Sequence, residues 1–217
     1  MNPTRTVSEL TNTTESAWPL ILDSVKEAAT TVKVIPVEDN RGADTLNRLQ
    51  VTTRSYMGAI AFNCGGLVVD HGWLRIFGAG GEGLPSIASV KNLGEPENSP
   101  GQPGYIIAAY DVYGGVFAIN GGQLVGQPGE VCYYGQDTLD WTPIGLGYQD
   151  FIEWSLGGGL EGFYQDFRWV DWKKDTEKLG LDQAFSVFPL LSTVEGQDPE
   201  KVSRAAVPVL ELFGWTS

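Results

Sequence analysis

The sequence contains no lysine and no arginine between Asn92 and Phe167, although this stretch holds ten acidic residues. They are Glu95, Glu97, Asp111, Glu130, Asp137, Asp140, Asp150, Glu153, Glu161 and Asp166. The formal net charge of the whole chain is −13. A folded surface built from this stretch should repel nucleic acids and anionic membranes and attract basic partners. We therefore expect a basic protein partner, no nucleic acid and no membrane.

Cysteine and histidine are also scarce. The 217 residues include two cysteines, Cys64 and Cys132, and one histidine, His71. Two cysteines in a chain of this length do not form a disulfide framework, and one histidine with them cannot complete a common structural zinc site. We expect two buried free thiols, no metal and no cofactor.

Long apolar runs are missing as well. No run approaches the roughly 20 residues of a membrane-spanning helix, and the first residues lack the apolar core of a secretory signal. The expected location is cytoplasmic. The composition, with 42% hydrophobic residues, seven tryptophans and 19% charged residues, suffices for a packed core and differs from that of a disordered acidic tail.

The order of local patterns predicts a single α+β domain over residues 1–217. Apolar residues recur at helical spacing in 1–50, short apolar runs alternate with glycine turns in 51–144, and helical patterns return in 145–217. We predict a largely antiparallel or mixed central sheet over about Val32 to Ile144, flanked by N-terminal and C-terminal helices. Within this outline, Gly58–Phe62 is predicted as a strand and Asp198–Phe213 as a helix that Pro208 kinks or breaks.

One glycine-rich segment, Gly78–Gly83, matches the G-x-G-x-x-G pattern of dinucleotide-binding turns. The context does not support that function, because Leu84-Pro85 follows at once and Ser86–Lys91 is too short for a crossover helix. We expect a glycine turn without a phosphate site.

The single histidine lies in Asp70-His71-Gly72-Trp73, between two predicted strands. Any hydrolase that uses an imidazole base must use His71. Neighbours in a strand or turn tend to point apart, so Asp70 need not orient His71, and a structural turn is the favoured interpretation. The alternative is a small-molecule-binding protein or hydrolase with a pocket around Asp70, His71, Trp73 and Arg75, in which His71 and Asp70 would be catalytic.

Aromatic residues are densest in Phe163–Trp172. Core packing is the favoured interpretation, with Arg168 paired to Asp166 or Asp171. An interface is the alternative, because Trp, Tyr and Arg are over-represented in binding hot spots. Self-association through this segment is therefore a further hypothesis.

Four segments, taken together, resemble an uncharacterised bacterial family, domain of unknown function 2625. They are Leu46–Ser55, Gly58–Ala61, Asp70–Arg75 and Phe163–Trp169. The likeness covers nearly the whole chain and implies no established activity.

Three further segments are similar to the second half of the SUKH superfamily: Tyr105–Asn120, Gly129–Tyr134 and Gly147–Trp154. Members of that group are α+β binding modules, and many bacterial members are immunity proteins that neutralise toxins delivered between competing cells. This resemblance implies a protein-binding role without catalysis.

We therefore expect a non-enzymatic, acidic protein-binding module that recognises a basic protein such as a secreted nuclease toxin. Complementary charge would accelerate association, and aromatic side chains would supply much of the affinity. The predicted partner-binding residues are Glu130, Asp137, Asp140, Tyr148, Asp150, Glu153 and Trp154.

Overall fold

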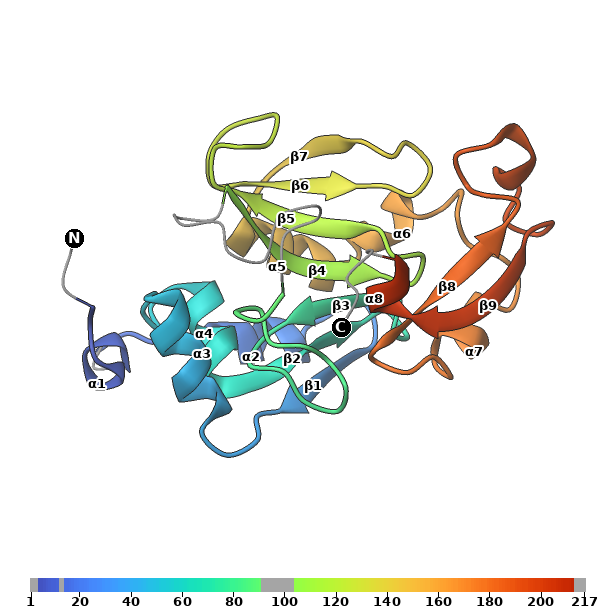
Figure 1. Ribbon diagram of the computed structural model, residues 1–217. Coiled ribbons are helices and arrows are strands. Elements are labelled where there is room, and N and C mark those ends of the chain that lie inside the picture. Colours follow the sequence, from blue (N-terminus) through green and yellow to red (C-terminus); the bar gives the residue numbers. More distant parts are fainter. Residues whose placement is uncertain (1–3, 12–13, 91–103, 213–217) are drawn as a thin grey trace.

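A seven-stranded antiparallel sheet, with its strands in chain order, is the centre of the fold (Figure 1). The structure is a computed structural model that describes residues 4–11, 14–90 and 104–212. Each strand pairs with its neighbour in sequence, as short glycine turns between apolar runs favour. The strands are β1 (Val32–Pro36), β2 (Cys64–Val69), β3 (Leu74–Phe77), β4 (Tyr105–Asp111), β5 (Val116–Asn120), β6 (Glu130–Tyr134) and β7 (Trp141–Gly147).

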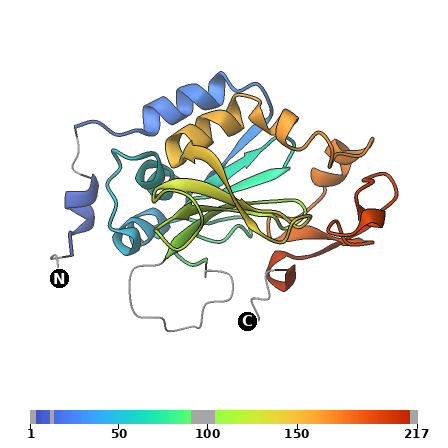
Figure 2. The ribbon, with the colours of Figure 1, turned by 90° about the horizontal axis from the view of Figure 1, so that it is seen from above.

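Helices cover one face of this sheet. Helices α2 (Trp18–Lys26) and α5 (Tyr148–Leu156) lie side by side above the strands (Figure 2), and α4 (Tyr56–Asn63) leads directly into β2. Ile21, Ile60 and Phe151 from these three helices belong to one buried core cluster with sheet residues. The other helices that precede residue 170 are α1 (Val7–Thr11), α3 (Arg41–Leu49) and the short α6 (Gly159–Phe163).

The C-terminal part forms a second, smaller sheet beside the first (Figure 1). After α7 (Trp172–Thr176), strands β8 (Gln183–Phe188) and β9 (Ser203–Pro208) pair antiparallel, and the turn η1 (Val194–Gly196) lies in their connection. The chain then enters α8 (Val209–Leu212). A backbone hydrogen bond of 2.6 Å from Phe185 N to Val112 O joins β8 to the end of β4.

The strand register places Lys33, Val68, Arg75 and Tyr110 in one row across β1 to β4. Residues directly opposite each other on paired strands point to the same face, and consecutive residues alternate between faces. Their sequence neighbours, such as Leu67, Val69 and Leu74, belong to the core cluster beneath the helices. The row therefore lies on the opposite face, the side where the C-terminal segment packs.

The predicted α+β class and central antiparallel sheet are confirmed, with the sheet running from Val32 to Gly147. The predicted strand Gly58–Phe62 is wrong, because these residues form α4. Ser55 caps this helix, its Oγ accepting a 3.0 Å hydrogen bond from Gly58 N.

The segment 145–217, predicted to carry the C-terminal helices, also contains two strands. Ser203–Pro208 forms β9, whereas the sequence predicted a helix over Asp198–Phe213. The apolar residues of this segment suit both periodicities, and Pro208, which lacks an N–H, is unfavourable inside a helix and acceptable at the end of an edge strand. Phe213 lies outside the described residues.

Candidate functional site

The turn between β2 and β3 has an unusual backbone conformation. Asp70, His71 and Gly72 have φ angles of 56°, 56° and 85°, all in the left-handed region. Glycine adopts this region readily, whereas for Asp and His it is uncommon. A 2.9 Å hydrogen bond from Trp73 N to Asp70 O closes the turn. The side chains of Asp70 and His71 contact different partners, Arg168 and Glu177.

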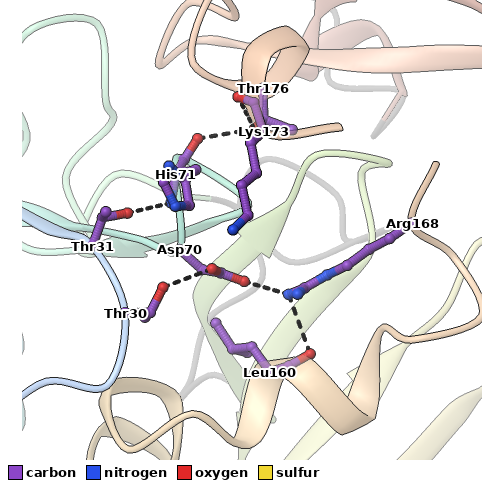
Figure 3. A network of polar contacts seen from close by, with 8 residues as sticks. All are labelled: Thr30, Thr31, Asp70, His71, Leu160, Arg168, Lys173 and Thr176. Atoms are coloured by element: carbon purple, nitrogen blue, oxygen red, sulfur yellow. Dashed lines mark hydrogen bonds and ion pairs between the residues drawn. The ribbon is translucent and has the colours of Figure 1, made fainter. Parts of the chain in front are cut away.

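Asp70 forms an ion pair with Arg168, 98 residues later in the chain (Figure 3). Its other carboxylate oxygen accepts a 2.7 Å hydrogen bond from Thr30 Oγ1. The Arg168 guanidinium also stacks on Trp172, 4.2 Å from the ring centre. The side chains of Asp70 and Arg168 are 10% and 14% exposed, so this ion pair is largely buried. The expected pairing of Arg168 with Asp166 or Asp171 is thus wrong.

His71 is oriented by a different carboxylate, since its Nδ1 lies 2.7 Å from Glu177 Oε1. The backbone of His71 is fixed as well. Its N–H donates to Thr31 Oγ1 at 2.6 Å, and its carbonyl accepts from Thr176 Oγ1 at 2.9 Å (Figure 3). Glu177 was not found by sequence reasoning, because it is 106 residues from His71 and belongs to no motif.

A cavity of about 410 Å³ lies between β1 to β3 and the segment that links α7 to β8. Its apolar lining includes Val32, Val68, Leu179 and Leu181. Its polar lining consists of Thr31, Lys33, His71, Arg75, Thr176 and Glu177.

The predicted pocket is therefore divided by the structure. His71 and Arg75 line the same cavity, whereas Trp73 is fully buried in the core beneath the helices. Asp70 lines a separate, smaller cavity of about 170 Å³, together with Arg168 and Lys173. Simple alternation would place His71, Trp73 and Arg75 on one side, and the left-handed backbone of the turn interrupts it, so that Trp73 enters the core.

Arg75 is a buried charged residue at this cavity. Its side chain is fully buried, and none of its three nitrogens has a hydrogen-bond partner among the described residues. Burial lowers the pKa of the guanidinium, while Tyr110 and Asp111 favour its charged form. The guanidinium carbon lies 5.5 Å from the centre of the Tyr110 ring. The Tyr110 hydroxyl donates to Leu181 O, which holds the C-terminal segment against the sheet.

Asp111, one of the ten acidic residues of the basic-free stretch, is also in the core. Its Oδ2 accepts hydrogen bonds from Tyr133 OH at 2.7 Å and Tyr164 OH at 2.8 Å. Its Oδ1 accepts from the backbone N–H groups of Tyr113 and Gly115. Burial raises the pKa of Asp111, and these four donors act in the opposite direction. This carboxylate has a structural role and cannot contribute to a surface patch.

Two of the predicted partner-binding carboxylates are used within the fold. Glu130 accepts hydrogen bonds from Gln127 N at 3.0 Å and Gly145 N at 2.9 Å. Glu153 accepts from Ser24 Oγ at 2.9 Å and Tyr56 OH at 2.5 Å, which links α5 to α2 and α4.

The other predicted partner-binding residues are divided between two places. Asp150, Tyr148 and Trp154 belong to α5, where Asp150 is exposed, the Tyr148 hydroxyl is buried and Trp154 packs edge-on against Phe163. Asp137 and Asp140 lie in the connection between β6 and β7, beyond the far end of the strand that Glu130 begins.

At about 3.3 Å per residue, the four steps from Glu130 to Tyr134 span about 13 Å. Asp137 and Asp140 thus lie beyond the end of β6 opposite to Glu130, and the partner-binding role of the seven residues stays a prediction. Asp137 instead lines a hollow of about 490 Å³ together with Asp166 and Phe167. Glu95 and Glu97 lie outside the described residues.

Both cysteines, Cys64 and Cys132, are free and buried, as predicted. Among the described residues, no three His, Cys, Asp or Glu side chains come together in a way that could hold a metal ion. No helix in the described ranges is long and apolar enough to cross a membrane.

The model of one protein family, "Protein of unknown function DUF2625", matches residues 7–212. The chain belongs to this family. It is 38% identical over 209 residues to the uncharacterized protein YbfG of Escherichia coli (strain K12), covering 96% of this chain and 94% of that protein. It is 34% identical over 189 residues to an uncharacterized protein of Haemophilus influenzae (strain Rd). This match covers 87% of this chain and 83% of that protein.

No solved structure matches the chain significantly. The match of the family model confirms the resemblance to this family that was predicted from Leu46–Ser55, Gly58–Ala61, Asp70–Arg75 and Phe163–Trp169. The weaker resemblance to the SUKH superfamily stays a prediction.

Proposed function

We propose that this protein binds a small molecule in the cavity bordered by His71 and Arg75. The observation that supports the proposal is the convergence on one cavity of polar side chains from β1, the β2–β3 turn, β3 and α7. A volume of about 410 Å³ lies within the range of roughly 300–1,000 Å³ that small-molecule sites occupy. An apolar lining with a few polar groups is also typical of such sites.

Binding without catalysis is the better interpretation of this lining. Hydrolysis by an imidazole base would require a nucleophile or a positioned water next to His71. The two lining hydroxyls, Thr31 and Thr176, are both engaged with the His71 backbone, and the described lining includes neither Ser nor Cys. The lining therefore favours a binding site over the active site of a hydrolase.

The test is a fragment screen by ligand-observed NMR on the wild type and on Val68→Trp, whose indole would fill part of the cavity. Val170→Trp is the matched control, because Val170 is 86% exposed and does not line the cavity. We expect a set of fragments that bind the wild type and the control and lose binding to Val68→Trp. Equal binding to all three proteins, or no binding at all, would contradict the proposal.

A basic protein partner is a second candidate, supported by the acidic hollow between the β6–β7 connection and η1. Asp137 and Asp166 line it together with Phe167 and Pro199, and no lysine or arginine is among its described lining residues. A lysine or arginine of a partner would find two carboxylates and an aromatic surface there. The immunity-type role is a narrower version of this candidate and stays a prediction.

This second candidate is tested by capture from native lysate at low and high salt. The variant carries Asp137→Lys and Asp166→Lys, and its control carries Glu27→Lys and Asp44→Lys, two exposed acidic residues outside the hollow. We expect salt-sensitive capture by the wild type and the control, and loss of capture by the hollow variant. Capture unchanged by the hollow variant would reject this surface.

A further inference from the structure

We infer that the ligand of the His71–Arg75 cavity is a monocarboxylic acid with an apolar body, and that Arg75 binds its carboxylate. This inference rests on the proposed small-molecule function and specifies the chemistry of the ligand.

A guanidinium has five N–H donors, and Arg75 has no acceptor for any of them within the described chain. Its side chain is fully buried on one face of the sheet. Val68 and Tyr110 lie opposite Arg75 on the two neighbouring strands. A buried charge without hydrogen bonds opposes folding, and an apolar side chain of similar size would be tolerated better at such a place. A charge in this position is therefore better explained by binding than by stability.

The nearest groups do not complete the hydrogen bonding of Arg75. Tyr110 offers the face of its ring, and its hydroxyl donates to Leu181 O. Asp111 lies on the other face of β4, where its two oxygens accept four hydrogen bonds from other groups. Asp111 thus attracts the guanidinium through space and is not its acceptor.

The other charged residues of the cavity have partners already. Lys33 forms an ion pair of 2.5 Å with Glu82, and His71 Nδ1 lies 2.7 Å from Glu177. Of the charged side chains that line the cavity, Arg75 is left as the one without an ion-pair or hydrogen-bond partner in the described part of the chain.

The composition of the lining points to the class of anion. The planar fork of Arg binds a carboxylate through two parallel hydrogen bonds. One unpaired positive charge matches one carboxylate, whereas a phosphate dianion would be left with excess negative charge near Glu177. Val68, Leu179 and Leu181 provide an apolar surface for the rest of the molecule.

Binding requires a local movement, because the guanidinium is covered by its surroundings. Arg75 lines the cavity, and its long side chain can turn toward it by changes in its own torsion angles. The gain of two charge-assisted hydrogen bonds provides the reason for this movement.

The experiment compares matched pairs of ligands by calorimetric or NMR titration. The probes are isovalerate with isovaleramide, phenylacetate with phenylacetamide, and phenyl phosphate. They are tested in addition to the fragments of the NMR screen described above. The proteins are the wild type, Arg75→Met, and the control Arg54→Met, which removes an arginine that is 64% exposed and outside the cavity.

We expect each carboxylate to bind the wild type and Arg54→Met about tenfold or more tightly than its amide, and Arg75→Met to abolish this preference. Equal affinity for acid and amide, or a preference that survives in Arg75→Met, overturns the inference and leaves the proposed binding function intact. If the wild type binds phenyl phosphate more tightly than phenylacetate, the ligand is not a monocarboxylic acid. If no probe or fragment shows binding that Val68→Trp removes, both the inference and the proposed function fail.

Discussion

Arg75 and Tyr110 lie directly opposite each other on β3 and β4, with the guanidinium carbon 5.5 Å from the ring centre. This contact is a favourable interaction of a buried cation that has no hydrogen-bond partner among the described residues. A cation over an aromatic ring is stabilised by about 0.5–2 kcal/mol. That is less than the several kcal/mol by which burial of an unpaired ion opposes folding.

The first prediction concerns the stability of Arg75→Met. Replacing the unpaired cation by an apolar side chain of similar length should raise the free energy of unfolding by about 1–3 kcal/mol. Urea denaturation of the wild type, Arg75→Met and Arg54→Met measures this. The exposed control should differ from the wild type by less than about 0.5 kcal/mol. A clear loss of stability in Arg75→Met would mean that Arg75 has a structural partner.

The second prediction concerns the ion pair between Asp70 and Arg168. Arg168→Met leaves Asp70 buried without its charged partner, so we expect a loss of about 3 kcal/mol or more of unfolding free energy. Lys26→Met is the matched control, because Lys26 and Asp23 form an exposed pair with side-chain exposures of 71% and 65%. That change should alter the free energy by less than about 0.5 kcal/mol. Similar values for both variants would contradict the structure around Asp70.

The third prediction concerns the tyrosines at alkaline pH. Burial raises the pKa of Tyr56 and Tyr110 to about 12, and it raises the pKa values of Tyr133 and Tyr164 well above the usual value for tyrosine. Because these pKa values are higher in the folded than in the unfolded state, their contribution to stability is complete below pH 10. It is lost as the pH rises from 10 toward 12.

Absorbance of tyrosinate, recorded together with the circular dichroism signal, tests this prediction. We expect most of the tyrosinate to form only as the fold is lost. Tyr56→Phe should lose less stability over the same pH range than the wild type, because it lacks one of the raised groups. Full ionisation of the tyrosines in a protein that keeps its circular dichroism signal would contradict the buried network.

The fourth prediction concerns Cys64. Burial raises the pKa of its thiol to about 12, so the reactive thiolate is scarce and covered at neutral pH. In a Cys132→Ser variant, Cys64 should react with a disulfide reagent at the rate of unfolding or local opening, and quickly after addition of denaturant. A fast reaction in the native state would show that β2 is open at this position.

The central sheet could be predicted from local patterns, because alternating apolar residues and glycine turns specify antiparallel pairs within short segments. The extent Val32 to Gly147 therefore agrees closely with the prediction. The helix α4 was missed because Gly58–Phe62 is apolar throughout, and such a short run fits a buried helix as well as a strand. The strand β9 was missed because its apolar residues suit a helix as well as a strand, and its pairing with β8 is made across the connection that contains η1.

The candidate site could be predicted only in part. His71 and Arg75 were found because they belong to one short motif, and the structure places both at one cavity. Glu177 and Thr176 could not be found, since they reach the turn from α7 and the residue after it, about 105 residues away. The partners of Asp70, which are Thr30 and Arg168, are also far from it in sequence, at 40 and 98 residues.

The sequence by itself determined the charge balance, the two free thiols, the antiparallel character of the sheet and the family membership, because these follow from composition, spacing and nearby residues. The tertiary structure alone decided which charges are paired. It placed Asp111 in the core, engaged Glu130 and Glu153 within the fold, and left Arg75 without a hydrogen-bond partner in the described part of the chain. The physical reason is that burial and hydrogen bonding depend on contacts between segments far apart in the chain, which local sequence does not specify.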